Sequence, residues 1–102
     1  MALKARIHLL DEDGEIVGAK IRDVSETGLF VRMDRIPLIG SEIEVLIQDH
    51  GEKWVLTGTV VRTVRYEPDP AGHSGIGVEV DENSVVELGD VIEMLDVHQA
   101  QA

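Results

Sequence analysis

Apolar and polar residues alternate through most of the chain, and this period of two constrains the fold more than any other feature. Side chains of a β-strand point alternately to the two faces of a sheet, so the alternation predicts strands with one buried face. It also interrupts every long apolar run. We therefore expect neither a signal peptide nor a membrane-spanning helix. The first strand shows the pattern clearly, with apolar residues at 3, 5, 7 and 9 and polar ones between them.

Turn-forming residues divide this alternating region into six segments. Asp11–Gly14 ends in Asp-Gly, which is a strong signal for a β-hairpin. Val24–Gly28 is expected to form a second turn, and Asp34–Ser41 a loop, because it holds a proline and a glycine. Gly58 falls inside a long strand and suggests a bend or bulge there. The strands are expected at residues 3–9, 15–23, 29–33, 42–47, 53–66 and 75–80.

The period changes near the C-terminus. Ser84-Val85-Val86-Glu87 fits a capping box, in which the serine and glutamate side chains bond amides at the start of a helix. Helical spacing of apolar residues follows, and it predicts a helix over Val85–Asp96 whose apolar stripe packs on the strands. Residues 99–102 are expected to be a frayed tail. The predicted stripe consists of Val85, Leu88, Val91, Ile92 and Leu95.

Six hairpin-linked strands and one helix predict an all-β fold, a six-stranded antiparallel barrel with a C-terminal helix. An open sheet of this kind would leave unpaired edges and one wet apolar face, whereas a closed barrel removes the edges and lets the helix cover one opening. The length of 102 residues fits one domain, which we place at residues 1–98.

Composition narrows the range of functions. The chain has no cysteine, and hence neither disulfides nor a thiolate nucleophile. Twenty acidic residues against nine basic ones give a net charge of −11, which disfavours DNA or RNA as a partner. The basic residues are spread along the chain without a cluster. A small anionic ligand is not excluded, because a pocket for it needs only a few well-placed arginines.

The most informative segment is Asp23-Val24-Ser25-Glu26-Thr27-Gly28. Aspartate and serine side chains at this spacing bond nearby backbone amides in turns, and glycine permits backbone conformations that other residues avoid. Spacing alone favours a turn that satisfies its own hydrogen bonds. In that case Gly28 has a positive φ or lies where a side chain would collide. The same atoms can also be presented to a ligand.

The motif D/N-x-S-x-x-G between two strands resembles the signature of the PilZ domain family. Three later segments are similar to that family in order and spacing, although the last ends in valine where a phenylalanine is usual. These segments are Gly40–Val45, Gly58–Arg62 and Gly75–Val80. The resemblance covers nearly the whole chain. It implies a bacterial receptor domain for cyclic di-GMP, a dianionic dinucleotide.

Ligand binding in the PilZ family uses two motifs, and the resemblance places Asp23, Ser25 and Gly28 in one of them. The other is an R-x-x-x-R pair just upstream of the first strand. The arginines of this chain stand at 6, 22, 32, 35, 62 and 65, so no two are four apart. The chain also begins at the expected first strand. We therefore expect weak or absent cyclic di-GMP binding, unless the chain is truncated or Arg6, Arg22 or Arg32 substitutes.

Other candidate sites are weaker. The histidines at 8, 50, 73 and 98 share no metal-ligand spacing, and no metal or cofactor is expected. Asp11–Gly14 lacks the carboxylate pattern of a calcium loop. Ser25 has no histidine or lysine near it in sequence to act as a base. Phe30 falls opposite the core face of its strand, and we expect it to be buried, for example under the helix, rather than to form an exposed anchor.

These observations predict a non-catalytic PilZ-type signalling or adaptor module of the bacterial cytoplasm. The resemblance implies a protein partner in motility, type IV pili or surface attachment. The first alternative is a true cyclic di-GMP receptor whose arginines are truncated or substituted. A second is a small-barrel enzyme, which the residues disfavour because they show no cluster of nucleophile, base or metal ligands.

Overall fold

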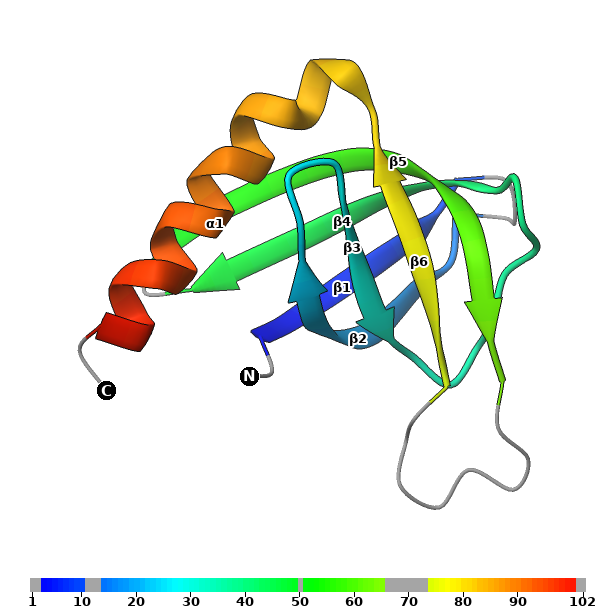
Figure 1. Ribbon diagram of the computed structural model, residues 1–102. Coiled ribbons are helices and arrows are strands. Elements are labelled where there is room, and N and C mark those ends of the chain that lie inside the picture. Colours follow the sequence, from blue (N-terminus) through cyan, green and yellow to red (C-terminus); the bar gives the residue numbers. More distant parts are fainter. Residues whose placement is uncertain (1–2, 11–13, 50, 66–73, 101–102) are drawn as a thin grey trace.

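The computed structural model describes residues 3–10, 14–49, 51–65 and 74–100 of the chain. Six strands and a helix follow one another in the order that the sequence predicts (Figure 1). A single 3₁₀ turn, η1 (Glu82–Ser84), leads into the helix, α1 (Val85–Ala100). The strands are β1 (Leu3–Leu9), β2 (Ile16–Val24), β3 (Gly28–Arg32), β4 (Glu42–Asp49), β5 (Glu52–Val64) and β6 (Gly75–Val80).

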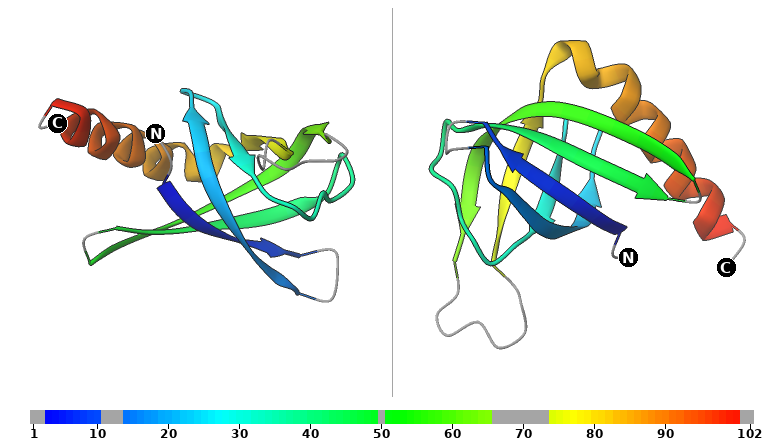
Figure 2. Two further views of the ribbon diagram at one scale, coloured as in Figure 1. Left: turned by 90° about the horizontal axis from the view of Figure 1, so that it is seen from below. Right: turned by 180° about the vertical axis from the view of Figure 1, so that it is seen from behind.

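The strands form a closed antiparallel barrel in the order β1-β2-β3-β6-β5-β4, and α1 lies beside it (Figures 1 and 2). Pairing of β1 with β4, at Ala5 and Ile47 among other positions, completes the ring. Each strand therefore has two hydrogen-bonded neighbours among the described residues, with β5 pairing with β4 along its first half and with β6 along its second. The predicted barrel is confirmed. The residues of the first predicted turn, 11–13, and the predicted loop around Pro68 lie outside the described residues.

The barrel interior holds the apolar half of the alternating pattern. Ile7, Val31 and Val45 are fully buried, while the residues between them on the same strands remain at least partly exposed. Burying one such side chain stabilises the fold by about 1.5–3 kcal/mol, so the inward positions hold the register of each strand. The predicted inward residues of β3 and β4 are confirmed: Leu29, Val31, Met33, Ile43, Val45 and Ile47.

The expected irregularity of β5 occurs at a different position. The register between β5 and β6 shifts between Val60 and Arg62, so the bulge lies there rather than at Gly58. Gly58 is paired in the ladder with Val80. A Cβ atom at Gly58 would come within 2.6 Å of the carbonyl oxygen of Glu79 on β6. Glycine is therefore required at this position by the close approach of the two strands, not by a bend.

The predicted capping box is wrong, because the Ser84 hydroxyl serves another segment of the chain. Its oxygen accepts a hydrogen bond from the backbone N–H of Thr57 on β5 at 3.0 Å, and it lies 3.1 Å from the Thr57 hydroxyl. Glu87 Oε2 is buried and has no hydrogen-bond partner in the part of the chain that the structure describes. Ser84 therefore fixes the start of the helix onto the barrel by a contact that local sequence does not reveal.

The helix packs against β5, and its predicted stripe is confirmed in part. Leu88 and Val91 are fully buried, and Ile92 packs against the core. Val85 is 44% exposed, because the helix starts on the Ser84 anchor and meets the core only from its second turn. The helix continues to Ala100, past the predicted end at Asp96. The side chain of Leu95 lies outside the described residues.

We predict that Ser84→Ala lowers the free energy of unfolding by about 1 kcal/mol, because it leaves the partly buried Thr57 amide without its acceptor. Chemical denaturation measures the loss, and amide hydrogen exchange locates it. Exchange should accelerate at Thr57. Asn83→Ala is the matched control, since Asn83 contacts the Thr57 hydroxyl only at 3.5 Å on the exposed side. Accelerated exchange at the Glu87 amide instead of the Thr57 amide would show that Ser84 caps the helix, as the capping box predicts.

Candidate functional site

The turn between β2 and β3 carries the D/N-x-S-x-x-G motif, and its hydrogen bonds are largely internal. The Ser25 amide donates to the Gly28 carbonyl oxygen at 2.8 Å. The Ser25 hydroxyl accepts from the Gly28 amide and lies within donating distance of the Gly28 carbonyl oxygen, each at 3.2 Å. The Thr27 carbonyl oxygen accepts from the Val80 amide at the end of β6. The predicted turn is thus confirmed, and it is tied to the neighbouring strand.

Gly28 is the residue of the motif at which the barrel has no space for a side chain. Its backbone is not in the left-handed region, since positive φ is found among the described glycines only at residues 14, 40 and 51. It lies opposite Glu79 in the β3–β6 ladder, and a Cβ atom there would overlap the carbonyl oxygen of Val78. Of the two predicted reasons for glycine at this position, collision is confirmed.

Asp23 is exposed, as is Ser25. The register between β2 and β3 shifts between Ile21 and Asp23, so that Arg22 forms a bulge. The Asp23 carboxylate is 75% exposed and lies 3.9 Å from the Nε atom of Arg22. Bulges redirect side chains at the ends of paired segments, and this one presents the carboxylate to the outer surface of the barrel. Asp23 is therefore available to a ligand, whereas the Ser25 hydroxyl is already bonded.

Phe30 lies next to the motif on the outer surface of the sheet, and its expected burial in the core is wrong. The ring is half-buried, with the Arg62 guanidinium 5.4 Å from its centroid. It lies over Gly75, where a Cβ atom would come within 3.0 Å of the ring. A glycine on β6 therefore gives the ring a place on the sheet surface, and the arginine covers it through a cation–π contact.

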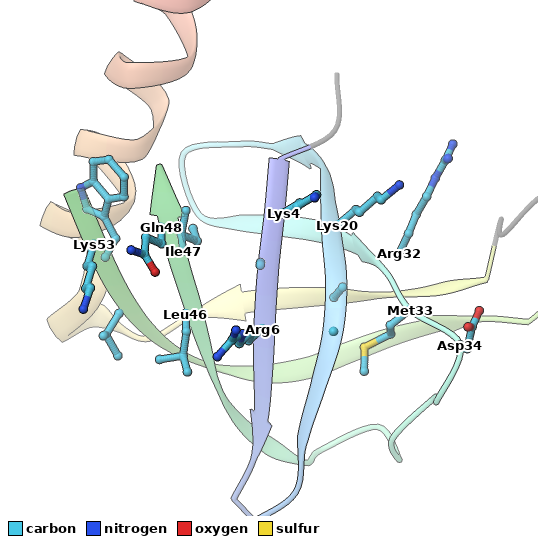
Figure 3. Close-up of a pocket in the computed structure, with 15 residues that line it drawn as sticks. Lys4, Arg6, Lys20, Arg32, Met33, Asp34, Leu46, Ile47, Gln48 and Lys53 are labelled. Atoms are coloured by element: carbon cyan, nitrogen blue, oxygen red, sulfur yellow. The ribbon is translucent and has the colours of Figure 1, made fainter. Parts of the chain in front are cut away.

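The basic residues cluster in space, which contradicts the expectation that they are spread out. Five of the nine lysines and arginines line one depression with a volume of ≈ 870 Å³ (Figure 3). The only acidic residue in its lining is Asp34. The five side chains lie on β1, β2, β3 and β5, and we call them the basic face: Lys4, Arg6, Lys20, Arg32 and Lys53.

Part of the basic face could have been predicted from the sequence. A hairpin centred on Asp11–Gly14 places Lys4 opposite Lys20, and the structure shows that pair. The β2–β3 turn likewise brings Arg32 opposite Lys20. Pairing the polar positions across the two predicted turns would therefore have found three of the five cations. Lys53 reaches the face only because the barrel closes through β1 and β4.

The described residues hold no grouping typical of a metal site and no membrane-spanning helix. Within the described residues, no three His, Cys, Asp or Glu side chains are grouped as a metal site would need. The Nδ1 atom of His8 lies 2.8 Å from Oε1 of Glu44, a contact between neighbouring strands. None of the helical residues that the structure describes forms a segment long and apolar enough to cross a bilayer.

The fold and the site define a small closed β-barrel domain whose candidate binding residues lie on its outer surface. The model of the PilZ domain family matches residues 1–96, and the chain belongs to this family. PilZ domains bind cyclic di-GMP, interact with proteins and are generally non-catalytic.

The chain is also similar to the PilZ domain of CeSA from a cellulose-synthesizing bacterium, known from a crystal structure. The TM-score is 0.73 at 16% sequence identity, with 94% of each chain covered. At this identity the likeness shows the shared fold. No curated protein matches the sequence.

We predict that Gly28→Val lowers the free energy of unfolding by at least about 1 kcal/mol, because the new side chain forces β3 away from the Val78 carbonyl group. Gly18→Val is the matched control. Gly18 lies on the exposed outer side of β2, and nothing lies within 4 Å of its missing Cβ atom. Thermal and urea unfolding of both variants measures the difference. Equal stability of the two would mean that β3 and β6 are not so closely apposed.

Proposed function

We propose that the protein is a non-catalytic PilZ adaptor of the bacterial cytoplasm, which acts by binding another protein. Its pathway is cyclic di-GMP-linked control of motility, type IV pili or surface attachment. Its own affinity for cyclic di-GMP is weak or absent, and it needs no cofactor. Asp23, Ser25 and Gly28 are then mainly structural remnants of a ligand site.

The observation that carries this proposal is the hydrogen bonding of Ser25. A hydroxyl that already accepts from the Gly28 amide and can donate to the Gly28 carbonyl oxygen has little capacity left for a ligand. To donate to a phosphate oxygen of a nucleotide, the Ser25 hydroxyl would have to give up its bond to the Gly28 carbonyl oxygen. The motif therefore supports the barrel in the absence of any ligand, which is what an adaptor that has lost the receptor function requires.

The arginines support the same conclusion. Arginine side chains bind phosphate groups and guanine edges with paired hydrogen bonds, each charge-assisted bond being worth about 1.5–3 kcal/mol. A domain without the R-x-x-x-R pair loses two such residues, and roughly two to four decades of affinity. The net charge of −11 further opposes a dianion.

The absence of catalysis is supported by the surroundings of the one candidate nucleophile. The hydrogen-bond partners of the Ser25 hydroxyl in the structure are backbone atoms of Gly28, and a backbone amide or carbonyl group cannot act as a general base at neutral pH. Activation of serine requires a positioned base within hydrogen-bond distance. Barrel and turn therefore supply a scaffold for binding rather than for chemistry.

A second candidate, a true cyclic di-GMP receptor, is favoured by one arrangement. The exposed Asp23 carboxylate has two arginines near it on the outer surface. Arg22 adjoins it at 3.9 Å, and Arg32 lies two residues beyond its cross-strand partner Phe30. No two arginines of the given sequence are four apart, so Arg22 and Arg32 would have to take the role of an R-x-x-x-R pair.

Calorimetric titration with cyclic di-GMP decides between the two candidates. We predict that the titration gives no binding isotherm with a dissociation constant in the low micromolar range or below. A receptor PilZ domain with an intact R-x-x-x-R pair, measured in the same buffer, serves as the positive control. Low-micromolar or tighter binding by this chain that is lost in Arg22→Ala or Arg32→Ala would contradict the adaptor proposal and support the receptor.

Substitutions in the motif separate a structural role from a ligand role. Ser25→Ala should lower the free energy of unfolding modestly, by about 0.5–1.5 kcal/mol, through its lost bonds to the Gly28 backbone. Asp23→Ala should change it by less than about 1 kcal/mol, because the exposed carboxylate has only its 3.9 Å contact with Arg22 to lose. Binding of a protein partner should persist in both variants. Denaturation midpoints and partner pull-down together test this. Unchanged stability combined with a lost biological output would place a ligand on the turn.

A further inference from the structure

The basic face consists of cations without an ion-pair partner in the described part of the chain. Among the described residues, Lys4, Arg6, Lys20, Arg32 and Lys53 form no ion pair, although the chain carries 20 acidic residues. The Nε atom of Arg32 is buried and lacks an acceptor in the same part of the chain. Solubility does not explain five unpaired cations around one depression, because the net charge of −11 already keeps the protein soluble.

The ladder places like charges directly opposite one another. Lys20 on β2 faces Lys4 on β1 and Arg32 on β3, with all three side chains on the outer side of the sheet. On β4, Gln48 continues the row one step beyond the Ala5–Ile47 pair, and it faces Lys53 on β5. Neighbouring strands are about 4.8 Å apart, and like charges at that separation destabilise a sheet. The fold thus retains an arrangement that weakens it.

Apolar side chains adjoin the row. Val55 lies two residues from Lys53 and is 49% exposed, and it faces the half-buried Leu46 on β4. Trp54 also lines the depression. A patch that combines cations with an exposed aliphatic side chain and a partly buried tryptophan has the composition of a protein-binding surface.

The geometry points to an acidic, amphipathic segment of another protein as the occupant of the basic face. Carboxylates three or four residues apart on a helix are about 5–6 Å from one another, close to the spacing of the cations across the strands. Apolar residues beside those carboxylates would contact Leu46 and Val55. This inference rests on the proposed adaptor function, for which it specifies the surface and the chemistry of the partner.

Other anionic occupants fit the face less well. A DNA or RNA duplex carries a continuous line of phosphates and would be repelled by the acidic remainder of the molecule. A lipid surface is flat, whereas the strands that carry the face follow the curve of the barrel from β3 through β2 and β1, and past β4, to β5 (Figure 2). Cyclic di-GMP offers two charges to five cations. A second copy of the chain, through its own acidic surface, is the remaining competitor.

A titration of the ¹⁵N-labelled protein followed by NMR tests the inference. The probe is a helical peptide with glutamates along one face and leucines beside them, and the control peptide has glutamine in place of each glutamate. We expect saturable shifts at Lys4, Lys20 and Arg32 with the acidic peptide only. Its affinity should fall as salt is added, because screening weakens the ion pairs.

Two charge-reversal variants sharpen the test. Lys20→Glu should weaken peptide binding about tenfold or more, because it removes the centre of the row. Arg65→Glu is the matched control, with the same change of net charge. Arg65 follows the end of β5 opposite to Lys53, about 40 Å along the strand. Its affinity should stay within about twofold of the parent protein.

Stability provides a second, opposite readout. Lys20→Glu turns two repulsive pairs into attractive ones, so its denaturation midpoint should rise while its peptide binding falls. A variant that merely misfolds would lose both. A midpoint that falls, with binding unchanged, would show that the cations serve the fold and would overturn the inference.

The remaining outcomes also decide. Absent shifts, shifts away from the face, or equal binding of both peptides would overturn the inference. So would tighter binding of a DNA duplex or of vesicles containing phosphatidylserine, or shifts at the face on concentrating the protein alone. Cyclic di-GMP added to the same sample separates the two proposals. Tight binding of the dinucleotide refutes the adaptor, whereas failure of the peptide alone refutes only the docking surface.

Discussion

Strand β6 lies between β3 and β5 in the ring, and at three glycines of these strands a Cβ atom would overlap the neighbouring backbone. Gly28 on β3 lies against the Val78 carbonyl group, Gly58 on β5 against Glu79, and Gly75 on β6 itself against β3. Larger residues at these points would separate the strands and open the ring. The rest of the structure depends on this closure. The end of β6 ties down the motif turn through the Thr27 carbonyl group, and the chain beyond it leads directly to the helix.

The sequence predicted what depends on nearest neighbours along the chain. The alternation predicted that residues such as Ile43 and Val45 lie inside the barrel, and both are buried. Hydrophobic burial fixes this arrangement, because a register shift of one residue would turn the apolar side chains of a strand to the outside. It failed where a residue is claimed by a distant segment. Ser84 fits a local capping motif, yet its hydroxyl serves Thr57, 27 positions away. Phe30 was expected inside, but a glycine on another strand gives it a surface site.

The same distinction applies to the candidate site. The turn around Ser25 and Gly28 was predictable, because its bonds span three residues. The basic face was not predicted, because its cations are far apart in sequence and are brought together by the order of the strands. Lys53 in particular joins Lys4 only through the β1–β4 pairing that closes the ring. A charge cluster of this kind is a property of the topology.

A basic face on an acidic protein also limits how it can bind. On β4, the outward Glu44 lies two residues from Leu46, the cross-strand partner of Arg6, or about 7 Å along the strand. Because the Debye length at physiological salt is about 8 Å, a partner at the Arg6 end of the face still meets this carboxylate, whereas a partner near Gln48, four residues from Glu44, is largely screened from it. At longer range, and at low salt, an acidic partner meets a net charge of −11 and is repelled. Association should therefore be slow for a charged pair, without the long-range steering of a uniformly basic protein. Affinity must come from close contacts, where ion pairs and the apolar contact with Val55 form together, and such a surface selects partners by shape as well as by charge.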